Sequence, residues 1–269
     1  MIDGVTRTES RHVVRVGDLS LVCHVRGRGP RCVAHPAGPG MHWEYLRMPL
    51  AERDHTMIYV EPAGTGASGS LPDGAAYDLD TYVSHLDAVV RAFADEPVFV
   101  LGHGHGGFIT QSYVAGLPDG VAGLILYATG PVADAQMLAQ ARWNLHRDAD
   151  EDVHDEESAT RRLRGVLPSH FAHYREREAE FAPVVAAVRC WPRPASDFAA
   201  VDLRGRLASI TVPTLILAGA RDVVFGPEAA AALRAGVPGA RVAIFEDSGR
   251  FAHLEEPQRF AHLLREFTG

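Results

Sequence analysis

The sequence predicts an α/β fold with a mostly parallel, doubly wound sheet and an inserted helical block. Short apolar runs alternate with segments whose apolar residues recur at steps of three and four, which is the pattern of strands joined by crossover helices. Glycine-rich turns follow several of these runs. The alternation breaks between about residues 131 and 206, where the chain is helical in character but richer in charged and aromatic residues.

The expected elements follow one another along the chain. Two β-rich runs at 13–16 and 19–25 predict a hairpin. Residues 79–93 carry one apolar stripe and predict a helix that Asp78 or Asp80 would cap. The further strands are expected at 32–35, 57–60, 97–101, 124–127 and 214–217, and the further helices at 108–115 and 260–267.

The composition is that of an ordinary globular protein of one large domain, or of a core with an insertion. The chain has 269 residues, 46% of them hydrophobic, and its 34 acidic and 26 basic residues leave a net charge of −8. This charge and the lack of a basic block argue against a nucleic-acid partner, because phosphate contacts need clustered cations. Every basic residue is arginine, which excludes Schiff-base, pyridoxal-phosphate and P-loop lysines.

The three cysteines, Cys23, Cys32 and Cys190, are widely spaced and predict neither a disulfide framework nor a redox pair. We expect them to be small buried hydrophobes in a reducing compartment. The first residues lack the apolar core of a signal peptide, and no stretch approaches about 18 uninterrupted apolar residues. The sequence therefore predicts a cytoplasmic protein without a membrane partner.

Four motifs carry a resemblance to a known family. In chain order they are 35–40 (HPAGPG), 61–69 (EPAGTGASG), 101–107 (LGHGHGG) and 247–257 (DSGRFAHLEEP). Together they resemble the α/β-hydrolases of the proline-iminopeptidase-like branch, and the resemblance covers nearly the whole chain outside the helical block. It implies an α/β-hydrolase fold with a core at 1–131 and 207–269 and a helical cap at 132–206.

The sequence departs from this family at the catalytic triad. In the family the turn reads G-x-S-x-G and presents a serine nucleophile on a sharp strand-to-helix corner, whereas the serine position here is Gly104. The family's acid matches Asp222, and the position of its histidine is Arg250. Glycine has no nucleophile, and a guanidinium that stays protonated is no general base. Ordinary acyl-enzyme hydrolysis is therefore not expected.

The altered site is predicted to stabilise anions. The resemblance implies an oxyanion hole made by the N–H of His105 and one N–H of the loop with the expected substrate-binding residues His35, Pro36 and Ala37. The positive end of the next helix lies beside it. We expect Arg250 to project into a pocket roomier than in the relatives and to form a bidentate pair with the acid. An inert salt bridge between those two side chains is the alternative.

Proton transfer in such a site needs a tunable group. His103 and His105 flank the corner, and His253 lies near Arg250, so each is a candidate. Glu61 ends a strand at the same edge of the sheet and is a possible base beside the substrate. The expected cap adds three residues that either shape the pocket or pack the cap: Trp143, His146 and Tyr174.

Other motifs point to neither a cofactor nor a metal. Two G-x-G-x-x-G patterns, at 102–107 and 64–69, lack the acidic residue or the helix that a dinucleotide fold needs. The histidine pairs at 103–105 and 170–173 lack a further carboxylate or thiol at ligand spacing. The acidic run at 148–157 is interpreted as a solvated loop.

The leading hypothesis is a cofactor-independent, non-hydrolytic enzyme of the lyase, decarboxylase, isomerase or cyclase type, acting on a small apolar carbonyl or carboxylate substrate. Two alternatives stay open: a catalytically silent hydrolase-fold protein that binds a ligand, and a serine hydrolase or aminopeptidase inactivated by mutation. The absence of lysine and the wealth of arginine, alanine and glycine are typical of high-GC bacterial genomes. By analogy, diverged hydrolase folds in such genomes serve specialised metabolism.

Overall fold

An eight-stranded sheet forms the centre of the molecule in the computed structural model, which describes residues 9–116, 118–133, 153–192 and 201–269. Its strands are β1 (Glu9–Val16), β2 (Leu19–Gly27), β3 (Arg31–His35), β4 (Thr56–Glu61), β5 (Val98–His103), β6 (Val121–Tyr127), β9 (Thr214–Gly219) and β10 (Arg241–Phe245). They lie in the order β1-β2-β4-β3-β5-β6-β9-β10. The β1–β2 and β2–β4 pairs are antiparallel and all other pairs in this sheet are parallel, as the predicted hairpin and crossovers require.

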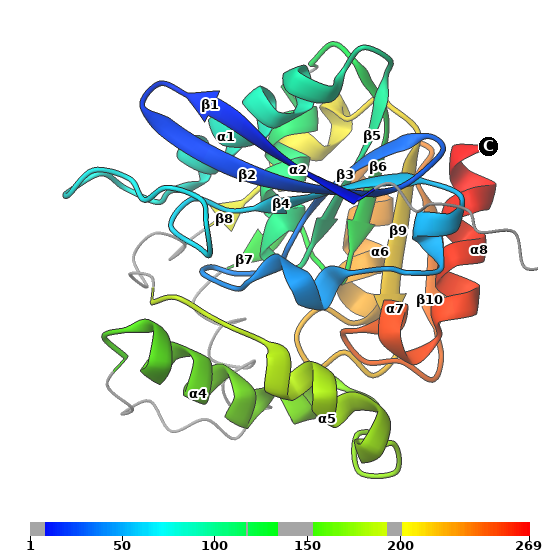
Figure 1. Ribbon diagram of the computed structural model, residues 1–269. Helices are drawn as coiled ribbons and strands as arrows, with labels where there is room; N and C mark the ends of the chain where they lie inside the picture. The colour runs from blue at the N-terminus through cyan, green and yellow to red at the C-terminus, as the bar shows by residue number, and fades with distance from the viewer. Residues whose placement is uncertain (1–8, 117, 134–152, 193–200) are drawn as a thin grey trace, which may run out of the picture.

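Helices cover both faces of this sheet (Figure 1). The core helices are α1 (Leu79–Phe93), α2 (His105–Val114), α6 (Pro227–Gly236), α7 (Ala252–Glu255) and α8 (Pro257–Thr268). One apolar layer joins the sheet to α1 and α6 through Leu86, Val90 and Leu233, and the other joins it to α8 through Phe260 and Leu264. The predicted doubly wound arrangement is therefore confirmed. Within the described ranges, no helix is long and apolar enough to cross a membrane.

Local sequence signals account for most of these elements. The Asp78 carboxylate accepts a hydrogen bond of 2.8 Å from the Thr81 N–H, which caps α1 and contributes about 1 kcal/mol to helix stability. Helix α2 begins three residues before its expected start, at His105, so that Gly104 alone separates it from β5. Among the core elements, strand β10 and helices α6 and α7 were not predicted. Helix α6 lies in an alanine-rich stretch that gives little apolar periodicity.

A further pair of helices lies outside the sheet, below it in Figure 1. These are α4 (Glu156–Val166) and α5 (Glu178–Ala187), and we call residues 153–192 the α4–α5 segment. Two short strands, β7 (Val132–Ala133) and β8 (Val201–Asp202), pair antiparallel where the chain leaves the core and returns to it.

The α4–α5 segment begins with a helix where a loop was expected. The Asp155 carboxylate accepts a hydrogen bond of 2.8 Å from the Ser158 N–H and so caps α4. The interpretation of the acidic run as a loop is therefore wrong for residues 155–157, because they form the cap and first turn of this helix. The part of the run at 148–152 lies outside the described residues.

Candidate functional site

The corner between β5 and α2 is built around Gly104. Its φ of 54° lies in the left-handed region, which glycine adopts without strain. A Cβ atom placed on Gly104 would lie 2.3 Å from Nη2 of Arg250 and 3.1 Å from Cβ of Ala37. The guanidinium therefore fills the space that the side chain of a nucleophile would need. The expectation of a roomier pocket is wrong at this point.

Arg250 reaches this corner from the loop after β10. Its backbone N–H donates to the carbonyl of His170 at 2.8 Å, and its guanidinium stands 5.3 Å from the centre of the Phe225 ring. Nη1 lies 3.4 Å from Oδ2 of Asp222, whose side chain is fully buried. The other carboxylate oxygen, Oδ1, accepts a hydrogen bond of 2.8 Å from the Val224 N–H. The expected bidentate pair is therefore wrong: one long contact joins the two side chains, since Oδ1 is engaged elsewhere.

The positive charge of Arg250 is only partly balanced. The residue is 9% exposed, so its guanidinium has lost most of its contact with water. Within the described part of the chain it makes a single side-chain hydrogen bond, to Asp222, although a guanidinium carries five N–H donors. An anionic oxygen brought beside this guanidinium would therefore meet a charged donor.

Tyr45, which the sequence did not single out, lies against the expected oxyanion loop. Its hydroxyl accepts a hydrogen bond of 2.5 Å from the Ala37 N–H and donates one of 2.8 Å to Nδ1 of His103. Burial raises the pKa of Tyr45, so the side chain is a neutral phenol. One N–H of the expected oxyanion loop is thus already satisfied. No spacing rule could have found this contact, because Tyr45 belongs to a separate 3₁₀ turn, Trp43–Leu46.

Two of the candidate histidines are held by hydrogen bonds on both ring nitrogens. His103 accepts from Tyr45 at Nδ1 and donates from Nε2 to the Arg250 carbonyl at 3.1 Å. His253 donates from Nε2 to the Tyr45 carbonyl at 2.8 Å and accepts at Nδ1 from the Tyr127 hydroxyl at 2.9 Å. Burial lowers the pKa of His103 well below its usual value and that of His253 to about 4. Both rings are therefore neutral at physiological pH.

The other two histidines lie on the two chain segments that meet at the corner. His35 ends β3, and its Nδ1 donates to the Pro36 carbonyl at 3.0 Å. His105 begins α2, with its ring packed 5.5 Å from that of Tyr82. Burial lowers the pKa of His35 to about 4 and that of His105 to about 3. The structure thus brings four predicted imidazoles to the same edge of the sheet, each of them uncharged near neutrality.

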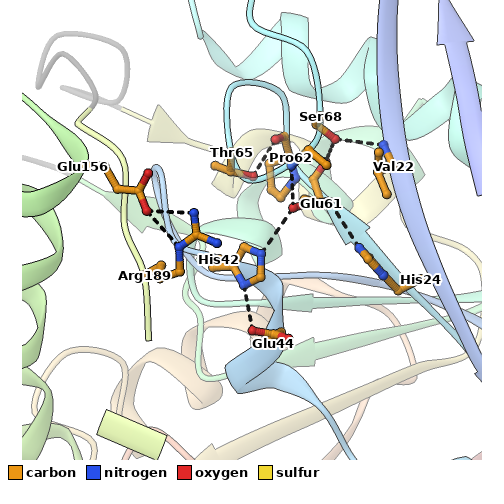
Figure 2. Close-up of polar contacts among 11 residues, drawn as sticks. Val22, His24, His42, Glu44, Glu61, Pro62, Thr65, Ser68, Glu156 and Arg189 are labelled. Atoms are coloured by element: carbon orange, nitrogen blue, oxygen red, sulfur yellow. Dashed lines mark hydrogen bonds and ion pairs between the residues drawn. The ribbon is translucent and has the colours of Figure 1, made fainter. Parts of the chain in front are cut away.

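Glu61 belongs to a different cluster, which Figure 2 shows. Its Oε1 accepts from Nε2 of His42 at 3.2 Å and from the Ala67 N–H at 2.9 Å, and its Oε2 lies 3.2 Å from Nε2 of His24. Burial alone would raise the pKa of Glu61, but the hydrogen bonds from His24 and His42 lower it to about 2. Both carboxylate oxygens are therefore occupied, by partners other than the histidines predicted for the site.

Of the three residues expected from the cap, only Tyr174 lies within the described residues. Trp143 and His146 lie outside the described residues. Tyr174 is half-buried, and its ring packs 5.7 Å from that of Phe171 against the apolar core. The contact of the α4–α5 segment with the site is made instead by the His170 carbonyl, which accepts from Arg250. A hydrogen bond between two backbone groups does not depend on residue type, so the sequence pattern could not predict it.

Comparisons with known proteins establish the family of this chain. A statistical model of the alpha/beta hydrolase family matches residues 29–263, so the chain belongs to that family. A 2-hydroxy-6-oxononadienedioate/2-hydroxy-6-oxononatrienedioate hydrolase of Cupriavidus pinatubonensis is 25% identical over 294 aligned positions, covering 100% of this chain and 98% of the relative.

Solved structures support the fold. An esterase from Exiguobacterium antarcticum superposes with a TM-score of 0.76 at 23% identity, covering 96% of this chain and 99% of the other. The proline iminopeptidase of Mycobacterium smegmatis gives a TM-score of 0.71 at 22% identity, with 96% and 97% covered. At these identities the likeness concerns the fold alone, and it confirms the predicted α/β-hydrolase architecture.

Proposed function

We propose that this α/β-hydrolase family member is a cofactor-independent, non-hydrolytic enzyme whose Arg250 holds an anionic oxygen of a small, largely apolar carbonyl or carboxylate substrate. The reaction classes that suit such a site are lyase, decarboxylase, isomerase and cyclase steps, because each develops negative charge on oxygen without a protein nucleophile. One observation carries the proposal: Nη2 of Arg250 stands where the side chain of the nucleophile would be.

The electrostatics of the corner favour an anion. The guanidinium is nearly buried and has one long contact with Asp222, so part of its charge is left for a ligand. The ten-residue helix α2 begins at the same corner and adds the partial positive charge of its N-terminus. In a site largely closed to water, these charges act more strongly than they would at the surface.

Proton transfer is assigned to His105. It begins α2 directly beside Gly104, and burial lowers its pKa to about 3, so the ring is neutral at physiological pH. A neutral ring of so low a pKa is a weak base, and an anionic substrate beside it would have to raise that pKa for the ring to take up a proton. His103 and His253 are less suited, because both of their ring nitrogens are engaged by backbone carbonyls and tyrosine hydroxyls.

The substrate class is supported by the surroundings of Arg250 and by one relative. The ring of Phe225 lies against the Arg250 guanidinium and gives the site one apolar side. We assign the α4–α5 segment, which contacts Arg250 through the His170 carbonyl, to a cap that spans 132–206. The relative from Cupriavidus pinatubonensis is named for a substrate with two carboxylates and an oxo group. Arg250 is suited to either kind of oxygen.

A ligand-binding protein without catalysis is the second candidate. It is favoured by the Tyr45 hydroxyl, which occupies the Ala37 N–H that an acyl-transfer enzyme would use for its oxyanion. An inactivated serine hydrolase is the weakest candidate, because loss of the serine alone would not place a guanidinium in the vacated space.

Two experiments test the proposal. Arg250→Ala is expected to abolish the binding of benzoate and pyruvate in calorimetric titrations, with Arg259→Ala, at the surface, as the matched control; equal binding by both variants would refute the anion site. The double variant Gly104→Ser/Arg250→His is expected to gain activity on simple esters and to be labelled by a serine-directed phosphonate. Labelling of the unmodified protein by that phosphonate would refute the loss of the nucleophile.

A further inference from the structure

His103 is the last residue of β5, and its side chain joins that strand to the loop that carries Arg250. The ring is fully buried, and its Nε2 lies 3.1 Å from the carbonyl oxygen of Arg250. A carbonyl oxygen can only accept, so Nε2 carries the proton of this hydrogen bond. Because Gly104 directly follows His103, the bond ties the corner itself to the residue whose guanidinium lies beside it.

The hydroxyl of Tyr45 holds the same ring from its other side. The Ala37 N–H donates to the Tyr45 oxygen at 2.5 Å, which leaves the phenolic proton for Nδ1 of His103 at 2.8 Å. Burial keeps the ring neutral by lowering the pKa of His103, and a neutral imidazole has a single N–H. With Nδ1 as the acceptor and Nε2 as the donor, one tautomer satisfies both of its partners.

The same arrangement occurs a second time, with the two imidazole rings 6.3 Å apart. The Tyr127 hydroxyl accepts from the His253 N–H at 3.2 Å and donates to Nδ1 of His253 at 2.9 Å. Nε2 of His253 then donates to the Tyr45 carbonyl at 2.8 Å. In each pair a tyrosine hydroxyl sets the tautomer of a histidine, and the histidine holds a backbone carbonyl. The pairs differ in the carbonyl that they hold: His253 holds that of Tyr45, and His103 holds that of Arg250.

The backbone around Arg250 is thus held on several sides. Its N–H donates to the His170 carbonyl at 2.8 Å, and the Gly249 N–H donates to Oε2 of Glu255 at 2.9 Å. The side chain is restrained less, because its one hydrogen bond within the described residues is 3.4 Å long. The place of the guanidinium therefore depends on the backbone contacts, and the contact made by His103 is the one that comes from the corner.

We propose that His103 is the positioning residue of Arg250: its Nε2–H, in the tautomer that Tyr45 sets, holds the guanidinium beside Gly104. The inference rests on the proposed function only in taking Arg250 as the group that binds an anion. It gives His103 a role other than proton transfer, since both of its ring nitrogens are engaged. The substrate meets the guanidinium, whereas His103 acts on it through the backbone.

Two amide side chains distinguish the two nitrogens of this ring. The glutamine amide reaches the position of Nε2 and can donate to the Arg250 carbonyl, whereas the shorter asparagine reaches only the position of Nδ1. We therefore expect His103→Gln to keep Arg250 in place and His103→Asn to release it, although both variants lose the imidazole. His55→Gln is the matched control, because His55 is a buried imidazole that bonds the Ala51 carbonyl at 3.1 Å and the Thr268 hydroxyl at 2.8 Å.

Labelling of Arg250 by phenylglyoxal in the full chain, followed by mass spectrometry, reports the release and needs no ligand. Arg259, which is exposed, is the internal reference in each sample. Loss of one buried hydrogen bond shifts a local opening equilibrium by about tenfold, so we expect labelling to rise by about that factor in His103→Asn. It should stay near the unmodified value in His103→Gln and in His55→Gln.

A second pair of variants covers the case in which His103→Asn does not fold. Tyr45→Phe removes the proton donor that sets the tautomer of His103 and should raise the labelling of Arg250. Tyr127→Phe removes a hydroxyl with the same kinds of partner, and it should leave the labelling unchanged. Equal labelling in these two variants would contradict the inference.

Titrations with benzoate separate this inference from the proposed function. If Arg250 binds the anion, His103→Asn should raise the Kd about tenfold and His103→Gln should leave it near the unmodified value. Equal labelling of Arg250 in these two variants, or an equal rise in His55→Gln, would overturn the inference. Benzoate binding that survives in Arg250→Ala would overturn the proposed function instead, and the labelling would still report what holds Arg250.

Discussion

Replacing Gly104 by serine tests whether a side chain at residue 104 competes with the Arg250 guanidinium for the same space. A side chain at φ 54° costs about 1–2 kcal/mol of backbone strain. Its Cβ would also lie 2.3 Å from Nη2 of Arg250, and moving the guanidinium away from buried Asp222 costs about 1–2 kcal/mol more. We expect Gly104→Ser to lower the free energy of unfolding by about 2–4 kcal/mol.

The pairwise part of this cost is isolated by a double-mutant cycle. Urea unfolding of the unmodified protein, Gly104→Ser, Arg250→His and the double variant gives four free energies of unfolding. Because a histidine is shorter than the arginine, the double variant should be about 1–2 kcal/mol more stable than the sum of the single effects predicts. Additive effects within about 0.5 kcal/mol would show that the guanidinium does not compete for the space beside Gly104.

Three further predictions concern the polar groups around this corner. Tyr45→Phe leaves the Ala37 N–H without its acceptor and should cost about 1–3 kcal/mol in urea unfolding; a neutral change would mean that another group satisfies that N–H. Glu61 has a folded pKa of about 2, lower than in the unfolded chain, so its contribution is present above about pH 4.5 and is lost as pH falls toward 2. Glu61→Gln should remove about 2 kcal/mol of that acid dependence, and unaltered acid unfolding would contradict the assignment. Glu255 has a raised folded pKa of about 7, so its contribution is present below about pH 4.5 and is lost as pH rises through 7. Glu255→Gln should abolish a decline of about 2–3 kcal/mol over that window, measured as unfolding free energy against pH.

The fold was predictable because its signals are local. The alternation of apolar runs and helical stripes, the turn after residue 16 and the Asp78 cap each depend on neighbours in sequence. Helix α6 was not predicted because its alanine-rich stretch has weak apolar periodicity, and the tertiary contacts of Leu233 hold it in place. Strand β10 is a short apolar run that ends at Phe245, and that run alone was not taken as a strand.

The sequence predicted only those site residues that belong to a recognisable motif. The departures of residues 104 and 250 from the family motif could be seen in the sequence. The single contact of Arg250 with Asp222 depends on the Val224 N–H, which no motif records. Tyr45 and Glu255 act through backbone N–H groups that lie far away in the chain. Such contacts form where loops from distant parts of the chain pack together, so residue type and spacing do not predict them.

The fit of Arg250 against Gly104 couples what either position can become. A first substitution that restores the hydroxyl at residue 104 meets the guanidinium in its place, and a first substitution that restores the imidazole at residue 250 finds no hydroxyl to activate. Neither single step gains a working nucleophile, and the first also costs stability. A serine and a histidine at residues 104 and 250 would therefore have to be introduced together, because each position constrains the other.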